Sequence, residues 1–120
     1  MKLSLVNASD ERDSTFELSR VQWAQGFFGR LIGLLGRTAV EADEGLLFAN
    51  CNAIHTVFMR IPIDVIYLRK ISQKYFEVVR VDIHVKPYRV FLPEFGADHV
   101  LETKANRCEV LKRGDRLCLS

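Results

Sequence analysis

The sequence predicts a mainly β fold with one or two short helices, and three features lead to this prediction. Residues 77–85, "EVVRVDIHV", alternate Val and Ile with polar side chains, which is typical of a strand with one buried face. Residues 63–68 are apolar except for Asp64, as expected for a strand buried on both faces. The rest of the chain holds short strand-like segments separated by polar turns, so we expect strands to dominate.

Shorter strand patterns lie on both sides of these two segments. Residues 2–6 and 15–21 alternate apolar and polar side chains over short spans, which suits edge or half-buried strands. Residues 46–48 can begin another strand, and "DHVLE" and "RLCLS" are expected to close the fold. The turn "KRGD" precedes the last strand, and we expect its Gly114 to adopt a positive φ.

A helix is predicted for residues 23–36, "WAQGFFGRLIGLLG". Its apolar residues recur at three- and four-residue spacing, and Gly36 is placed to end the helix. The following residues, 37–45, are expected to pass through a second helical turn or a loop before the next strand. These two segments account for the one or two short helices.

Two connections can also be predicted. The polar segment "RKISQKY", residues 69–75, suits the turn of a hairpin between two strands. Residues 86–97, "KPYRVFLPEFGA", are expected to form a loop, because Pro87 and Pro93 have no N–H to donate to a central strand ladder.

Length, composition and charge limit the class of protein. A chain of 120 residues that is 48% hydrophobic and 27% charged fits one domain, residues 1–120. The 17 Lys and Arg residues exceed the 15 Asp and Glu residues by two, and no basic run concentrates this excess. We therefore expect no nucleic-acid partner.

The N-terminal apolar stretch is too interrupted for a secretory signal, because Ser4 and Asn7 break it. No stretch approaches the roughly 20 apolar residues of a membrane span, so a cytoplasmic location is expected. The three cysteines, Cys51, Cys108 and Cys118, are widely separated, which argues against a disulfide framework and a zinc knuckle. We expect reduced, mostly buried thiols at Cys108 and Cys118, and no cofactor.

Cys51, His55 and Met59 are spaced four apart, which raises the question of a metal site or a catalytic pair. Such residues could share an ion on a helix, but on a strand they lie roughly 13 Å apart. The residues that follow Cys51 are rich in β-branched and aromatic types, which favours a strand from about His55 onward. We therefore predict no metal site and interpret Met59 as a core residue.

Asp64 is a carboxylate within an apolar run, and a buried charge requires a partner. Donors could come from His55, Arg60, Arg89 or backbone N–H groups of the loop bracketed by Pro87 and Pro93, and Glu102 raises the same question. Two interpretations remain open. Asp64 and Glu102 could bond backbone N–H groups to hold loops, or His55, Asp64, Arg89 and Glu102 could form one ligand-binding site.

Several motifs in order resemble an uncharacterised family, domain of unknown function 192, from about Gly26 to the end. They are "FFGRLIGLLGR", "DEGLLF", "IHTVFMRIPIDVIYL", "KPYR", "GADHVLE" and "KRGDRL". The resemblance implies a sandwich- or barrel-like β fold with short helices, but no reaction. The residues that match the family pattern are Gly33, Gly36, Arg37, Gly45, Phe48, Met59, Pro62, Asp64, Glu102, Gly114 and Asp115. Other members carry an aromatic and a tryptophan within 55–58 and need no cysteine at position 51.

Three functions are consistent with these features. The favoured one is a noncatalytic module in which Asp64, Arg89 and Glu102 line a pocket for a small polar or anionic ligand or a protein segment. The loop 86–97 adds the aromatic residues Tyr88, Phe91 and Phe95, and loops on a β scaffold often bind partners. A hydrolase could instead use His55 and Asp64, with or without Cys51. An accessory factor of an envelope or secretion apparatus is the third possibility, suggested by exported family members.

The other two histidines, His84 and His99, are interpreted as surface residues. His84 alternates outward in its predicted strand, and His99 is assigned to a polar turn.

Overall fold

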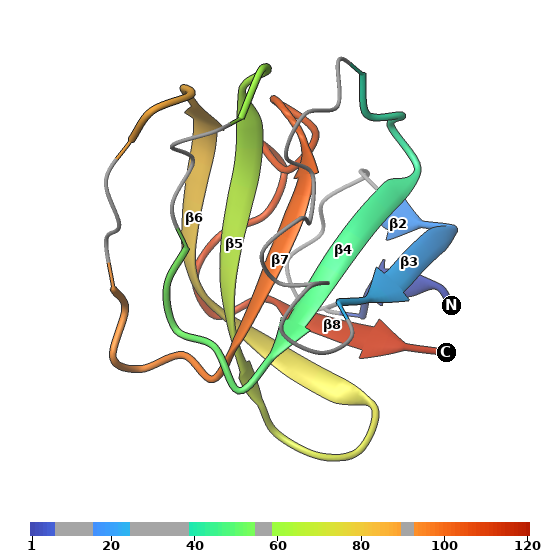
Figure 1. Cartoon of the computed structure of the whole chain (residues 1–120). Helices are drawn as coiled ribbons and strands as arrows, with labels where there is room; N and C mark the ends of the chain where they lie inside the picture. Colours follow the sequence, from blue (N-terminus) through green and yellow to red (C-terminus); the bar gives the residue numbers. More distant parts are fainter. Residues whose placement is uncertain (7–15, 25–38, 55–58, 90–92) are drawn as a thin grey trace.

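Eight strands form one mixed sheet in the computed structural model, which describes residues 1–6, 16–24, 39–54, 59–89 and 93–120 (Figure 1). The strands are β1 (Leu3–Leu5), β2 (Glu17–Leu18), β3 (Arg20–Trp23), β4 (Glu44–Ala49), β5 (Ile63–Lys70), β6 (Tyr75–Val85), β7 (His99–Lys104) and β8 (Arg116–Leu119). Their spatial order is β2-β1-β8-β6-β5-β7-β4-β3. Within this sheet β3 and β4 are parallel, and the other neighbouring pairs are antiparallel.

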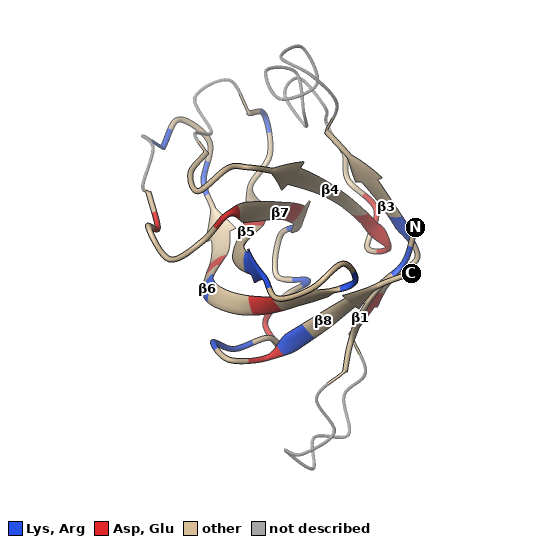
Figure 2. Cartoon of the chain, turned by 90° about the horizontal axis from the view of Figure 1, so that it is seen from below, with Lys and Arg blue, Asp and Glu red and all other residues tan. Residues whose placement is uncertain are grey.

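The sheet curves until its two ends meet. β2 and β3 lie at opposite ends of the strand order, yet only Ser19 separates them in the chain. The N–H of Val21 in β3 donates a 2.8 Å hydrogen bond to the carbonyl oxygen of Met1, just before β1. Figure 2 shows β1 and β3 on either side of the N-terminus. The fold is therefore mainly β and barrel-like, as predicted.

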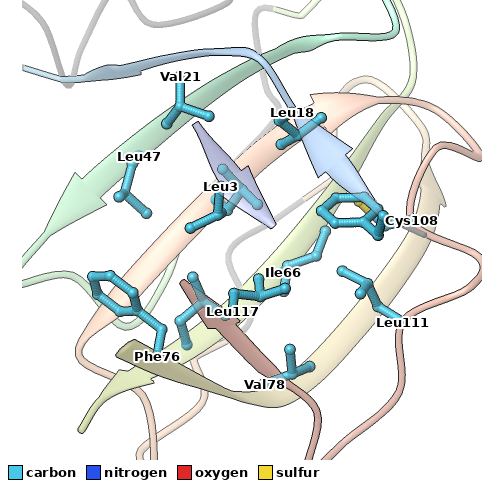
Figure 3. Packing of buried hydrophobic residues seen from close by; sticks show 13 residues of the cluster. Leu3, Leu18, Val21, Leu47, Ile66, Phe76, Val78, Cys108, Leu111 and Leu117 are labelled. Atoms are coloured by element: carbon cyan, nitrogen blue, oxygen red, sulfur yellow. The ribbon is translucent and has the colours of Figure 1, made fainter. Parts of the chain in front are cut away.

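Two apolar clusters form on opposite faces of the central strands. The inner cluster fills the space that the curved sheet encloses (Figure 3) and includes Ile66 of β5 and Leu101 of β7. The outer cluster includes Val65 and Val100 from the same strands, together with Met59 from the connection before β5. Because side chains alternate between faces, β5 contributes to both clusters. The prediction of a strand buried on both faces is confirmed.

The predicted turns and strands are largely confirmed in the described residues. Gly114 has φ 93° in the turn before β8, and the N–H of Asp115 bonds the carbonyl oxygen of Lys112. Residues 86–89 and 93–98 belong to no strand, as the two prolines predict.

β6 departs from simple alternation. Its pairing with β5 contains two register shifts, between Ile63 and Val65 and between Tyr67 and Leu68. An extra residue at such a bulge turns the following side chains toward the other face. Val78 is consequently fully buried, whereas Val79 and Val81 are only half-buried.

The predicted helix of residues 23–36 lies outside the described residues except at its start. Trp23 ends β3 and Ala24 follows it, while residues 25–38 lie outside the described residues. Residues 39–43 of the second predicted segment form a loop and a turn that lead into β4. The described ranges contain no helix that is long and apolar enough to cross a membrane.

Replacing Gly45 by valine should destabilise the fold by about 1–3 kcal/mol, because neighbouring side chains already fill the space that the valine would occupy. A Cβ at Gly45 would lie 2.9 Å from Leu18 Cδ1 and 3.1 Å from Leu101 Cδ1 in the inner cluster. The control is Gly96→Val on the exposed β6–β7 connection, where the nearest atom is 3.4 Å away. Urea unfolding measures both variants, and equal destabilisation would contradict this account of the inner cluster.

Candidate functional site

Asp64 lies fully buried in β5 and accepts hydrogen bonds from three backbone N–H groups. Its Oδ1 accepts from His84 and Asn106, each at 2.8 Å, and its Oδ2 accepts from Cys108 at 2.8 Å. These donors come from the end of β6 and from the turn that follows β7, not from the loop bracketed by Pro87 and Pro93 as predicted. One carboxylate therefore joins β5 to two segments distant in the sequence.

Two of the three donors belong to residues with left-handed backbone conformations. His84 has φ 53° and Asn106 has φ 66°, and this region costs an L-amino acid roughly 1–2 kcal/mol. Hydrogen bonds to a charged acceptor contribute about 1.5–3 kcal/mol each, which is enough to offset that cost. Of the two interpretations offered for Asp64, the geometry fits the one in which it binds backbone N–H groups and holds loops.

Glu102 lies in β7 with its side chain on the outer face of the sheet. Its register partners are Leu46 in β4 and Val65 in β5, so its immediate surroundings are apolar. The residue is 6% exposed, and within the described ranges no donor to its carboxyl group is found. Burial raises the pKa of Glu102 to about 8, so this side chain is mostly protonated at neutral pH.

The structure does not bring Asp64 and Glu102 together. Asp64 pairs with Thr103, and Val65 pairs with Glu102, so the two carboxyl groups point to opposite faces. Arg89 is exposed in the turn after β6, and His55 lies outside the described residues. Binding of a ligand by His55, Asp64, Arg89 or Glu102 individually stays a prediction.

Cys51 also lies away from Asp64, in the outer cluster. Its thiol is buried and donates to the carbonyl oxygen of Ala53 at 2.9 Å. The catalytic pair considered for Cys51 and His55 lies partly outside the described residues, which exclude 55–58. Among the described residues, no group of three or more potential metal ligands is present.

The assignment of His99 to the surface was wrong. His99 begins β7, is 6% exposed, and packs its ring against Phe76 and Trp23 at centroid distances of 4.9 and 5.9 Å. Its Nδ1 lies 2.7 Å from Oδ1 of Asp98. Side chains two residues apart in a strand share a face, so the apolar Leu101 was the signal that could have placed His99 on the inner face. His84, in contrast, is exposed as predicted.

Two aromatic side chains stand out on the connection between β6 and β7. Tyr88 is 73% exposed with φ 64°, and Phe95 is 86% exposed. The backbone around Phe95 is held at two points, since the N–H of Glu94 bonds the Asn52 carbonyl oxygen and the N–H of Asp98 bonds that of Leu68, each at 2.9 Å. The connection thus presents an apolar ring from a fixed backbone.

Taken together, these features define a barrel-like β domain in which a buried carboxylate holds the connections and exposed aromatic residues lie on one of them. The chain belongs to the DUF192 family, described as "Uncharacterized ACR", which matches residues 7–119. This confirms the resemblance drawn from the sequence motifs.

Two crystal structures share the fold. A protein of unknown function from Novosphingobium aromaticivorans superposes with a TM-score of 0.77 at 21% identity, covering 98% of this chain and 83% of its own. A protein from Sinorhizobium meliloti, described as "a putative transcription regulator", gives a TM-score of 0.76 at 21% identity, covering 97% of this chain and 90% of its own. A comparison with curated proteins returned no match.

Asp64→Asn should lower the free energy of unfolding by about 2–4 kcal/mol. Asparagine retains one oxygen, but its NH₂ group would face at least one of the backbone N–H groups now bonded to the carboxylate. Amide hydrogen exchange at His84, Asn106 and Cys108 should accelerate more than exchange in β8. Asp82→Asn, which removes only the partly exposed ion pair with Arg80, is the control and should cost about 1 kcal/mol or less. Unchanged exchange at all three donors would contradict the role of Asp64.

Glu102 should make the protein less stable as the pH rises. The carboxyl pKa is about 8 in the folded protein and near its ordinary 4.5 in the unfolded chain, so the folded state binds the extra proton. Its contribution to stability is complete below pH about 4.5 and is lost between there and pH about 8, by up to ~1.4 kcal/mol per pH unit. Chemical unfolding across this range should show a flatter profile for Glu102→Gln and an unchanged one for Glu77→Gln. Identical profiles for the wild type and Glu102→Gln would exclude this effect.

Proposed function

We propose that this protein is a noncatalytic binding domain that recognises a polypeptide segment of a partner through the β6–β7 connection. The observation that carries the proposal is the exposure of Tyr88 and Phe95 on this connection. Among the described residues, the next most exposed large apolar side chain is Met1, at 46%. Aromatic side chains are enriched among the residues that dominate binding energy at protein interfaces.

The backbone that presents Phe95 supports the same proposal. Glu94 and Asp98 are hydrogen-bonded to Asn52 and Leu68, and the N–H of Ala97 bonds the carbonyl oxygen of Glu94 at 3.0 Å. A ring held in place before binding loses less conformational freedom when a partner covers it. An exposed aromatic on a fixed turn is therefore better suited to recognition than one on an unrestrained loop.

The environment of the polar groups favours binding over catalysis. Both oxygens of Asp64 already accept backbone hydrogen bonds, which leaves this carboxylate poorly suited to act as a base. The Cys51 thiol is buried and bonded to a carbonyl oxygen, and a thiol in an apolar environment is usually unreactive. Asp64 and Cys51 therefore do not have the geometry of activated residues, and His55 of the hydrolase alternative lies outside the described residues.

Photo-crosslinking tests this proposal. The full-length protein, with a photoreactive amino acid at position 95, is irradiated in an extract of the source organism. A discrete protein adduct should form, and excess wild-type protein should suppress it. The Tyr88→Ser/Phe95→Ser variant should compete poorly because it lacks both rings. The matched control variant, Ile71→Ser/Tyr75→Ser, removes two exposed apolar side chains from the β5–β6 hairpin and should compete like the wild type.

Thermal unfolding must first show that both double variants remain folded. The proposal fails if no adduct forms at position 95, or if the Tyr88→Ser/Phe95→Ser variant competes as well as the wild type. It also fails if a photoreactive group at position 75 gives the same adduct in equal yield.

A further inference from the structure

Four basic residues lie at or next to the end of the sheet where β5 begins and β6 and β7 end. This end of the sheet is at the top of Figure 1. Ile63 pairs with Val85 on one side and with Lys104 on the other. Lys86 follows Val85 directly in the chain, and three further residues lead to Arg89. We call Arg60, Lys86, Arg89 and Lys104 the cationic end, and all four residues are exposed.

A fixed polar pair lies within this cationic end. The side-chain Nδ2 of Asn106 lies 3.4 Å from Nδ1 of His84, and both residues are exposed. Their backbones cannot move independently, because Oδ1 of Asp64 accepts a hydrogen bond from each. The imidazole and the amide are thus held next to one another among the basic residues.

The acidic residues nearby are already engaged. Asp64 is buried against backbone N–H groups, and the carboxylate of Asp82 lies 2.9 Å from Arg80. Glu44, adjacent in register to Lys104, lies 3.6 Å from Arg20. Within the described part of the chain, no carboxylate forms an ion pair with Arg60 or Lys104. The carboxylates of Asp64, Asp82 and Glu44 therefore do not neutralise Arg60 or Lys104.

We propose that the cationic end binds an acidic polypeptide segment that also carries an apolar side chain. This inference rests on the proposed function and names the chemistry of the partner. The partner segment should be acidic, because its carboxylates would face exposed Lys and Arg side chains of opposite charge. The segment should also carry an apolar side chain to cover Tyr88, which lies in the same turn as Lys86 and Arg89 and is 73% exposed.

A polypeptide fits this surface better than duplex nucleic acid. Duplex DNA carries one charge per about 1.7 Å of its axis, and proteins that bind it commonly neutralise about 6–10 phosphates. The cationic end offers only four basic side chains around one exposed aromatic ring. Attraction between exposed charges is also screened by salt, so binding should weaken as the ionic strength rises.

The test uses a short fluorescent peptide in which Glu alternates with Tyr, and a second peptide with Gln in place of Glu. Fluorescence anisotropy should show saturable binding of the Glu peptide and much weaker binding of the Gln peptide. Arg60→Gln/Lys86→Gln/Lys104→Gln should weaken binding of the Glu peptide about tenfold, because each exposed ion pair contributes modestly and three are removed. The matched variant Lys70→Gln/Lys74→Gln/Arg113→Gln changes the net charge equally at other exposed sites and should bind like the wild type.

Several results would overturn the inference. Equal losses in the two triple variants would show only a dependence on net charge, and equal binding of the Gln peptide would remove the acidic requirement. Displacement of the Glu peptide by inorganic phosphate or a single-stranded oligonucleotide at lower concentration would favour a different anion.

The same variants separate this inference from the proposed function. If the triple variant at the cationic end still forms the adduct from position 95, the proposed binding function stands. The inference that the cationic end binds an acidic segment of the partner then falls. If Glu-peptide binding depends on the cationic end but no adduct forms at position 95, acidic recognition stands and the proposed role of the whole β6–β7 connection falls.

Discussion

The hydrogen bonds accepted by Asp64 are the constraint on which this end of the protein depends. A buried carboxylate without donors would be strongly unfavourable, and here three backbone N–H groups surround it. In return the carboxylate holds His84 and Asn106 in left-handed conformations that L-amino acids adopt rarely. The end of β6, the start of β5 and the turn after β7 therefore have one common anchor.

The same register produces a different environment for Glu102. Asp64 and Glu102 lie on neighbouring strands only one pairing position apart, yet one side chain enters the donor-lined end of the inner face and the other enters an apolar part of the outer face. Burial without donors makes the protonated form of Glu102 the stable one, and its pKa rises to about 8. The fold thus holds two buried carboxyl groups with unlike roles.

Closure of the sheet leaves the connections as the main surfaces for recognition. With β3 joined to β1 through the hydrogen bond between Val21 and Met1, the ends of the sheet are not open for adding another strand at that point. The turn 86–89 belongs both to the β6–β7 connection and to the cationic end. A partner that covers this turn would contact the Tyr88 ring and several positive charges together, so the two proposals share the turn 86–89.

The sequence by itself determined the local features: the two central strands, the hairpin after β5, the proline-containing loop and the turn at Gly114. These follow from alternation, turn residues and the missing N–H of proline, which act over a few neighbouring residues. Tertiary structure alone decided that Asp64 and Glu102 point apart and that Arg60, Lys86, Arg89 and Lys104 gather at one end. Strand register sets the first result, because a shift of one residue in pairing moves every side chain to the opposite face. The order and direction of β5, β6 and β7 set the second, because they bring the start of β5 beside the ends of β6 and β7.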